Sequence, residues 1–81
     1  MAKGPASRAR IAWKQFGREL REVRKSYGSL RSVSATLGVD KATMSRAENG
    51  KPIEAHMLLW LADWAGRDVR CYLAPLYTDA R

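Results

Sequence analysis

Apolar side chains recur at spacings of three and four residues through the first third of the chain. They are Trp13, Phe16, Leu20, Val23 and Tyr27. This is the period of an amphipathic α-helix with one apolar stripe, and it predicts a helix over about residues 10–26 that Gly28 ends. Residues 1–9 show no such period, and we expect them to form a flexible basic arm.

Two short helices are expected next, with a tight turn at Gly38 between them. Ser29 is a favourable N-cap for the first of them and Asp40 for the second. Asn49 and Gly50, which tolerate a left-handed conformation, end the second. The side chains predicted to face inward from this pair are Leu30, Val33, Leu37, Met44 and Ala47.

A fourth helix is predicted over about residues 54–65, after Pro52 and before Gly66. It is apolar around most of its circumference, so we expect it to be covered on more than one side. Its apolar residues are Met57, Leu58, Trp60, Leu61, Trp64 and Ala65. The three tryptophans of the chain, Trp13, Trp60 and Trp64, are expected in the core rather than as stacking platforms for bases.

The tail, residues 67–81, changes to a period of two. Val69, Cys71 and Leu73 alternate with Arg70, Tyr72 and Ala74, which favours a β-strand between Asp68 and Tyr77. Since no other strand is predicted, we expect this strand to pair with its copy in a second subunit. The dimer interface is then predicted at Val69, Cys71 and Leu73.

The spacing of residues 30–49 is typical of a helix-turn-helix unit. Such a unit needs apolar contacts between its helices, a small residue where they cross, and a glycine in the turn. The contacts are provided by Val33, Leu37, Val39, Met44 and Ala47, the small residue is Ser34, and the glycine is Gly38. The pattern also occurs in other helical proteins, so it does not by itself identify a DNA-binding domain.

Charge adds a preference for a polyanionic partner. The 81 residues hold 15 Lys and Arg against 8 Asp and Glu, a net charge of +7. Residues 1–31 alone contain nine cations and only Glu19 and Glu22 as acids, so they account for the whole excess. Nucleic acid fits best; the alternatives are a solvated helix surface, or a membrane surface that would require a free apolar face.

The sequence gives little support to other classes of protein. Cys71 and His56 cannot form a disulfide or a metal site, and we expect no cofactor and no small-molecule ligand. Apolar runs fall short of the roughly 20 residues that span a bilayer, and no export signal follows the first residues. We therefore expect a cytoplasmic protein. We also expect that it is not an enzyme, because the sequence shows no nucleophile with an adjacent base, no carboxylate pair and no phosphate-binding loop.

Two stretches of the chain resemble the XRE-type regulators, the lambdoid repressor and Cro group. Phe-Gly-Arg-Glu-Leu-Arg-Glu-Val-Arg, residues 16–24, looks like the first helix of that family. Leu-Gly-Val-Asp-Lys-Ala-Thr-Met-Ser-Arg-Ala-Glu-Asn-Gly-Lys-Pro, residues 37–52, looks like its turn, recognition helix and exit. The resemblance covers about residues 16–66 and implies an all-α, lambda-repressor-like domain of four to five helices over residues 10–66.

The resemblance also implies roles for individual residues. The third helix would lie in the major groove with Lys41, Ala42, Thr43 and Arg46 on base edges. Arg24 and Glu48 resemble a structural ion pair of the family. Phosphates would be held by Ser29, Arg31, Ser45, Asn49 and Lys51, and we expect Arg18 and Arg21 on the first helix to meet phosphates as well.

The chain departs from the family pattern in two places. Leu30 stands where glutamine is common, and the turn Tyr27-Gly28-Ser29 is one residue shorter than usual. The implied function is a DNA-binding transcriptional regulator, a repressor acting as a homodimer at a near-palindromic operator. The alternative is an antitoxin that binds its own operator and neutralises a partner toxin. In the arm, Arg8 and Arg10 either follow a minor groove or make no contact.

Overall fold

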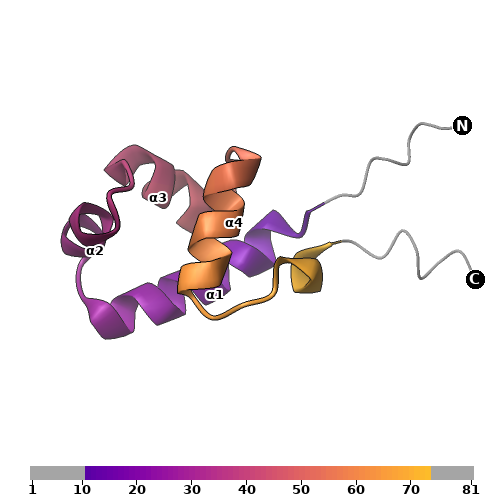
Figure 1. The fold of residues 1–81 in the computed structure, drawn as a ribbon, viewed down its shortest axis with the longest axis horizontal. Helices are drawn as coiled ribbons and strands as arrows, with labels where there is room; N and C mark the ends of the chain where they lie inside the picture. The colour runs from indigo at the N-terminus through magenta and orange to yellow at the C-terminus, as the bar shows by residue number, and fades with distance from the viewer. Residues whose placement is uncertain (1–10, 74–81) are drawn as a thin grey trace, which may run out of the picture.

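The computed structural model describes residues 11–73, and the regular elements of this part of the chain are all helices (Figure 1). Its elements are α1 (Trp13–Tyr27), α2 (Leu30–Leu37), α3 (Lys41–Glu48), α4 (Ala55–Trp64) and a 3-10 helix, η2 (Val69–Tyr72). The predicted all-α class is confirmed, and each expected α-helix forms within a few residues of its predicted ends. The basic arm, with Arg8 and Arg10, and the end of the predicted strand after Leu73 lie outside the described residues.

The apolar stripe of α1 packs into the core, as its spacing predicted. Phe16 and Leu20 are fully buried, and Trp13 packs against the same cluster. The last residue of the stripe behaves differently, because Tyr27 is 69% exposed. Its ring lies 5.4 Å from that of Trp64 instead of entering the core. Tyr27, the last residue of the apolar stripe, therefore lies at the surface beside α2 and Trp64 rather than in the core.

The pair α2 and α3 forms with the turn chemistry that the sequence predicted. The Ser29 hydroxyl oxygen accepts a hydrogen bond from the Ser32 amide at 3.1 Å, which caps α2. Gly38 takes the left-handed conformation with φ of +71°, where a side chain would be strained. Ser34 is buried where the helices meet, and Val33 lies beside it in the core. Asp40 occupies the N-cap position of α3, but its side chain makes no capping hydrogen bond.

A glycine in the middle of α1 sets how closely α1 and α3 approach. A Cβ atom on Gly17 would lie 2.4 Å from the carbonyl oxygen of Ala47 and 2.9 Å from that of Glu48. Both atoms belong to the backbone at the end of α3, so they cannot move aside as a flexible side chain would. Only glycine at position 17 lets the backbones of the two helices touch.

α4 is covered on one side only within the described chain. Leu58, Leu61 and Ala62 are buried, whereas Leu59 is 55% and Trp60 47% exposed. The expectation that Trp60 lies in the core was therefore wrong, and the described residues of this chain cover only one side of α4. Trp13 and Trp64 are partly buried against the core. No helix of the described residues has both the length and the apolar composition to cross a bilayer.

The segment after Gly66 corrects the prediction of a β-strand. Residues Val69–Tyr72 form η2, whose N-cap is Asp68: its carboxylate accepts a hydrogen bond from the Arg70 amide at 2.9 Å. The alternation of the sequence placed Cys71 inward, but Cys71 is exposed and Tyr72 is fully buried. The Tyr72 ring meets Phe16 edge to face at 5.1 Å. Burial of one large ring in the core of its own chain outweighs the period of two.

The end of the described chain pairs with its beginning. Leu73 forms an isolated antiparallel bridge with Ile11, and the Ala12 amide donates to the Tyr72 carbonyl at 2.6 Å. Figure 1 shows the two ends side by side. The prediction that Val69, Cys71 and Leu73 form a strand interface between subunits thus loses its strand, because the backbone of this segment is bonded within the chain.

We predict that Gly17→Ala destabilises the protein by about 2 kcal/mol, because the new methyl group must push α1 away from the end of α3. Alanine in an ordinary helix position would instead stabilise by about 1 kcal/mol, so the sign of the change is diagnostic. Chemical denaturation measures it, with Glu22→Ala at an exposed position of α1 as the control. A Gly17→Ala protein as stable as the wild type would contradict the close approach.

We predict that Tyr72→Phe costs about 1 to 2 kcal/mol near neutral pH, because its hydroxyl donates to Glu19 at 2.6 Å. This bond is the main cause that lowers the pKa of Glu19 below its usual 4.5. Burial, followed by the same bond, raises the pKa of Tyr72 above its usual 10.0. The pair therefore stabilises the fold above about pH 4.5 and below about pH 10.

The difference in stability between wild type and Tyr72→Phe is thus expected to shrink as the pH falls below 4.5, when Glu19 takes up its proton. Thermal unfolding at a series of pH values measures it. Tyr27→Phe removes a hydroxyl from an exposed ring and serves as the matched control. A difference that stays constant from pH 3 to pH 7 would sink the assignment to Glu19.

Candidate nucleic-acid interface

The outer surface of α3 carries the residues that the sequence nominated for reading bases. Its inner side is fixed by Met44, Ala47 and Glu48, all buried. At 100° per residue, Ala42 and Arg46 lie opposite that inner side. Lys41, Ala42 and Arg46 are exposed and Thr43 is partly exposed. The four nominated side chains therefore lie at the surface of one short helix, whose other side packs against the rest of the fold.

Arg46 is held back toward α4. Its guanidinium donates to the Pro52 carbonyl oxygen at 3.0 Å. A surface groove at this place is lined by Thr43, Arg46, Pro52, Ile53, Glu54 and Met57. Arg46 must release Pro52, or turn part of its fork outward, before it can reach a base.

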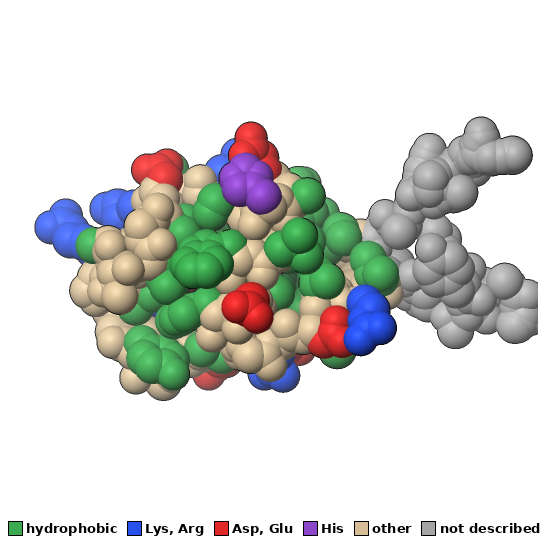
Figure 2. Space-filling model, in the orientation of Figure 1, with side chains coloured by type: hydrophobic (Ala, Val, Ile, Leu, Met, Phe, Trp, Pro, Cys, Tyr) green, Lys and Arg blue, Asp and Glu red, His purple; other side chains and the backbone are tan. Residues whose placement is uncertain are grey.

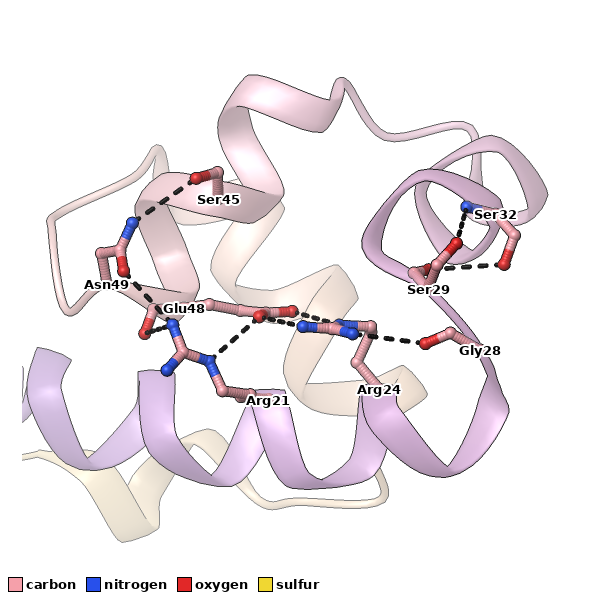
Figure 3. Close-up of polar contacts among 8 residues, drawn as sticks. All are labelled: Arg21, Arg24, Gly28, Ser29, Ser32, Ser45, Glu48 and Asn49. Atoms are coloured by element: carbon pink, nitrogen blue, oxygen red, sulfur yellow. Dashed lines mark hydrogen bonds and ion pairs between the residues drawn. The ribbon is translucent and has the colours of Figure 1, made fainter.

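Glu48 joins α3 to α1 through a buried ion pair. Its side chain is 3% exposed and accepts from Arg24 at 2.8 and 2.7 Å, a two-pronged contact (Figure 3). The Glu48 carboxylate is the main cause that raises the pKa of Arg24 above its usual value. Arg24 also donates to the carbonyl oxygen of Gly28 at 3.3 Å. One guanidinium thus fixes α3 and the short turn before α2, and the structural ion pair that the resemblance implied is present.

Arg21 adds a second contact to the same carboxylate and continues to the surface. It donates to Glu48 Oε1 at 3.3 Å and to Asn49 Oδ1 at 3.2 Å, and the Asn49 amide donates to the Ser45 hydroxyl at 3.4 Å (Figure 3). Asn49 and Ser45 were both nominated as phosphate contacts. The structure brings them together with Arg21, whose side chain remains 43% exposed.

A basic groove runs between α1 and the end of α3. It is lined by Lys14, Arg18, Arg21, Glu48, Asn49 and Gly50. Arg18 and Arg21 were predicted to meet phosphates, whereas Lys14 was not. The signal was present, because residues 14, 18 and 21 follow the spacing of one helix face. Lys14 lies against Gly50, where an added Cβ would be 3.0 Å from its Cγ.

The remaining nominated residues lie apart from this groove. Ser29 and Arg31 are exposed at the beginning of α2, and Lys51 is exposed just after α3. The first amides of α2 point out of the helix there, and the positive end of its dipole favours an anion. The Ser29 oxygen already accepts from Ser32, so its hydroxyl hydrogen is what it can offer to a ligand.

Comparison of this chain with family models, with curated protein sequences and with solved structures finds no match.

We predict that Glu48→Gln lowers the free energy of unfolding by about 2 to 3 kcal/mol, because Arg24, whose side chain is 15% exposed, then keeps its charge without a carboxylate partner. The glutamine has the same shape, so packing is preserved. Thermal unfolding gives the change. Asp68→Asn, which weakens the exposed pair between Asp68 and Arg70, is the control and should leave the melting temperature unchanged. Equal effects of the two substitutions would argue against a structural role for Glu48.

Proposed function

We propose that this protein is a sequence-specific binder of double-stranded DNA and acts as a transcriptional regulator, a repressor. One observation carries the proposal. Two short helices joined by a left-handed glycine present the exposed side of α3, with Lys41 and Arg46, while Glu48 and Gly17 fix the other side to α1. A helix held in this way fits the width of the major groove.

The side chains on α3 match the chemistry of base edges. Arg46 and Lys41 can donate to O6 and N7 of guanine, Thr43 to a base edge or a phosphate, and the Ala42 methyl can touch a thymine methyl. Arg46 exchanges its bond to the Pro52 carbonyl for this contact. We therefore expect a guanine in each half-site of the operator.

Phosphate contacts on either side of α3 would hold the domain in register. On one side are Ser29 and Arg31 at the beginning of α2. On the other, Asn49 lines the basic groove that contains Arg18 and Arg21, Ser45 is hydrogen-bonded to Asn49, and Lys51 follows α3. These groups set orientation rather than sequence preference, because every nucleotide carries the same phosphate.

We further propose that two copies bind a near-palindromic operator with half-sites about ten base pairs apart, one turn of DNA. The alternative of an antitoxin depended on a carboxy-terminal strand that pairs across a dimer. Residues Val69–Tyr72 form a 3-10 helix instead, so no observation favours that alternative over DNA binding alone.

The proposal predicts that the protein enriches a duplex from a random DNA pool and binds it with a steep salt dependence. With about four phosphates neutralised, affinity should fall roughly 10²-fold between 50 and 200 mM salt. Arg46→Ala should cost about 1 to 3 kcal/mol on the enriched duplex, relax the preference at one base pair, and leave non-specific binding nearly intact. Fluorescence anisotropy with both duplexes measures these changes.

Arg70→Ala is the matched control, because it removes the same charge from an exposed arginine that pairs with Asp68 on η2. It should leave both affinities nearly unchanged. If Arg46→Ala lowers specific and non-specific binding equally, Arg46 is only a phosphate contact. If no duplex is enriched and affinity ignores salt, the protein is not a sequence-specific DNA binder.

A further inference from the structure

The strongest apolar exposure of the described chain lies on α4. Three large apolar side chains are substantially exposed, Tyr27, Leu59 and Trp60, and two of them belong to this helix. On α4, Leu59 and Trp60 lie on the side opposite Leu58 and Leu61, which the core covers. Figure 2 shows hydrophobic side chains gathered over α4, with Lys and Arg at the edges of the view. A small domain gains stability by covering such a patch.

The charge of α4 favours a second copy of this chain as the occupant. α4 is the one α-helix in residues 11–73 without Lys or Arg; α1, α2 and α3 each carry at least one. Two copies of a chain with a net charge of +7 repel each other. That repulsion is weakest when they meet through the helix that carries no cation.

The outer face of α4 is also complementary to itself. His56, Leu59, Trp60 and Asp63 share one face, since residues three, four and seven apart align on a helix. Around a two-fold axis between residues 59 and 60, with the helices antiparallel, Leu59 meets the partner's Trp60 and His56 lies opposite the partner's Asp63. The His56 side chain is 73% exposed, with its Nε2 3.5 Å from Glu54 Oε1.

We propose that the α4 face, defined as His56, Leu59, Trp60 and Asp63, docks against the same face of a second copy of this chain. The rings of Trp64 and Tyr27, 5.4 Å apart, border the face at one end. None of the residues nominated for DNA contact belongs to α4. The interface would bring two DNA-binding units together, and this role rests on the proposed function. The existence of the interface can be tested separately, in the absence of DNA.

Sedimentation equilibrium without DNA tests the interface. The wild type should show a monomer–dimer equilibrium, and Trp60→Lys should weaken it more than about 30-fold, because a central aromatic residue is replaced by a cation that would be buried against Leu59 and close to its own copy across the two-fold axis. Ala35→Lys adds the same charge at an exposed position of α2 and should leave the dimer nearly intact. Circular dichroism shows that each variant keeps its helical content.

A charge exchange tests the register. His56→Asp places two acids opposite each other twice around the axis and should weaken the dimer about fivefold. The double variant His56→Asp with Asp63→Lys should recover the lost affinity. Within one α4 the two residues are about 10 Å apart along the axis, so recovery can come only from the partner.

A wild type that stays monomeric up to millimolar concentration, or a Trp60→Lys protein that dimerises as the wild type does, overturns the proposal. A double variant no tighter than His56→Asp overturns the antiparallel register. A protein that dimerises but binds no DNA would support this interface and contradict the proposed function. A protein that binds DNA but does not dimerise would support the proposed function and contradict this interface.

Discussion

The crossing of α1 over the end of α3 is the constraint on which the other elements depend. It needs two features at once: a position without a side chain at Gly17, and a buried carboxylate at Glu48 that Arg21 and Arg24 of α1 reach. The glycine brings the backbones together, and the ion pair sets their rotation. Because Arg24 also bonds the Gly28 carbonyl, the same contact fixes where α2 begins. The exposed side of α3 is thus determined by what its buried side binds.

Local signals in the sequence predicted most of the helices and their ends. The amphipathic period of α1, the Ser29 cap and the left-handed Gly38 act over three to five residues, so they can be recognised without knowing the fold. The core residues of α2 and α3 follow the same logic, because Val33, Met44 and Ala47 repeat at helical spacing and are buried. Once the buried residues of α3 are known, the remaining positions of the helix define its exposed side.

Contacts between distant residues were the ones that local patterns missed. The alternation after Gly66 has the period of a strand, but Tyr72 contacts Phe16 and Glu19, more than fifty positions earlier, and these contacts decide the conformation of the segment. Arg21 was expected to meet phosphate, but its bonds to Glu48 and Asn49 within the chain were not predicted. Gly17 gave only a weak local sign, a glycine inside a helix, whose meaning depends on the helix that crosses it.

The antiparallel bridge between Ile11 and Leu73 places the two ends of the described domain next to each other. A unit whose ends are neighbours can be inserted into an exposed loop of another protein without stretching its host. For the same reason the chain order is not essential to the fold: a short linker could join the existing ends, with new ends opened in the exposed turn at Gly66. The bridge thus makes this domain a portable module and a candidate for circular permutation.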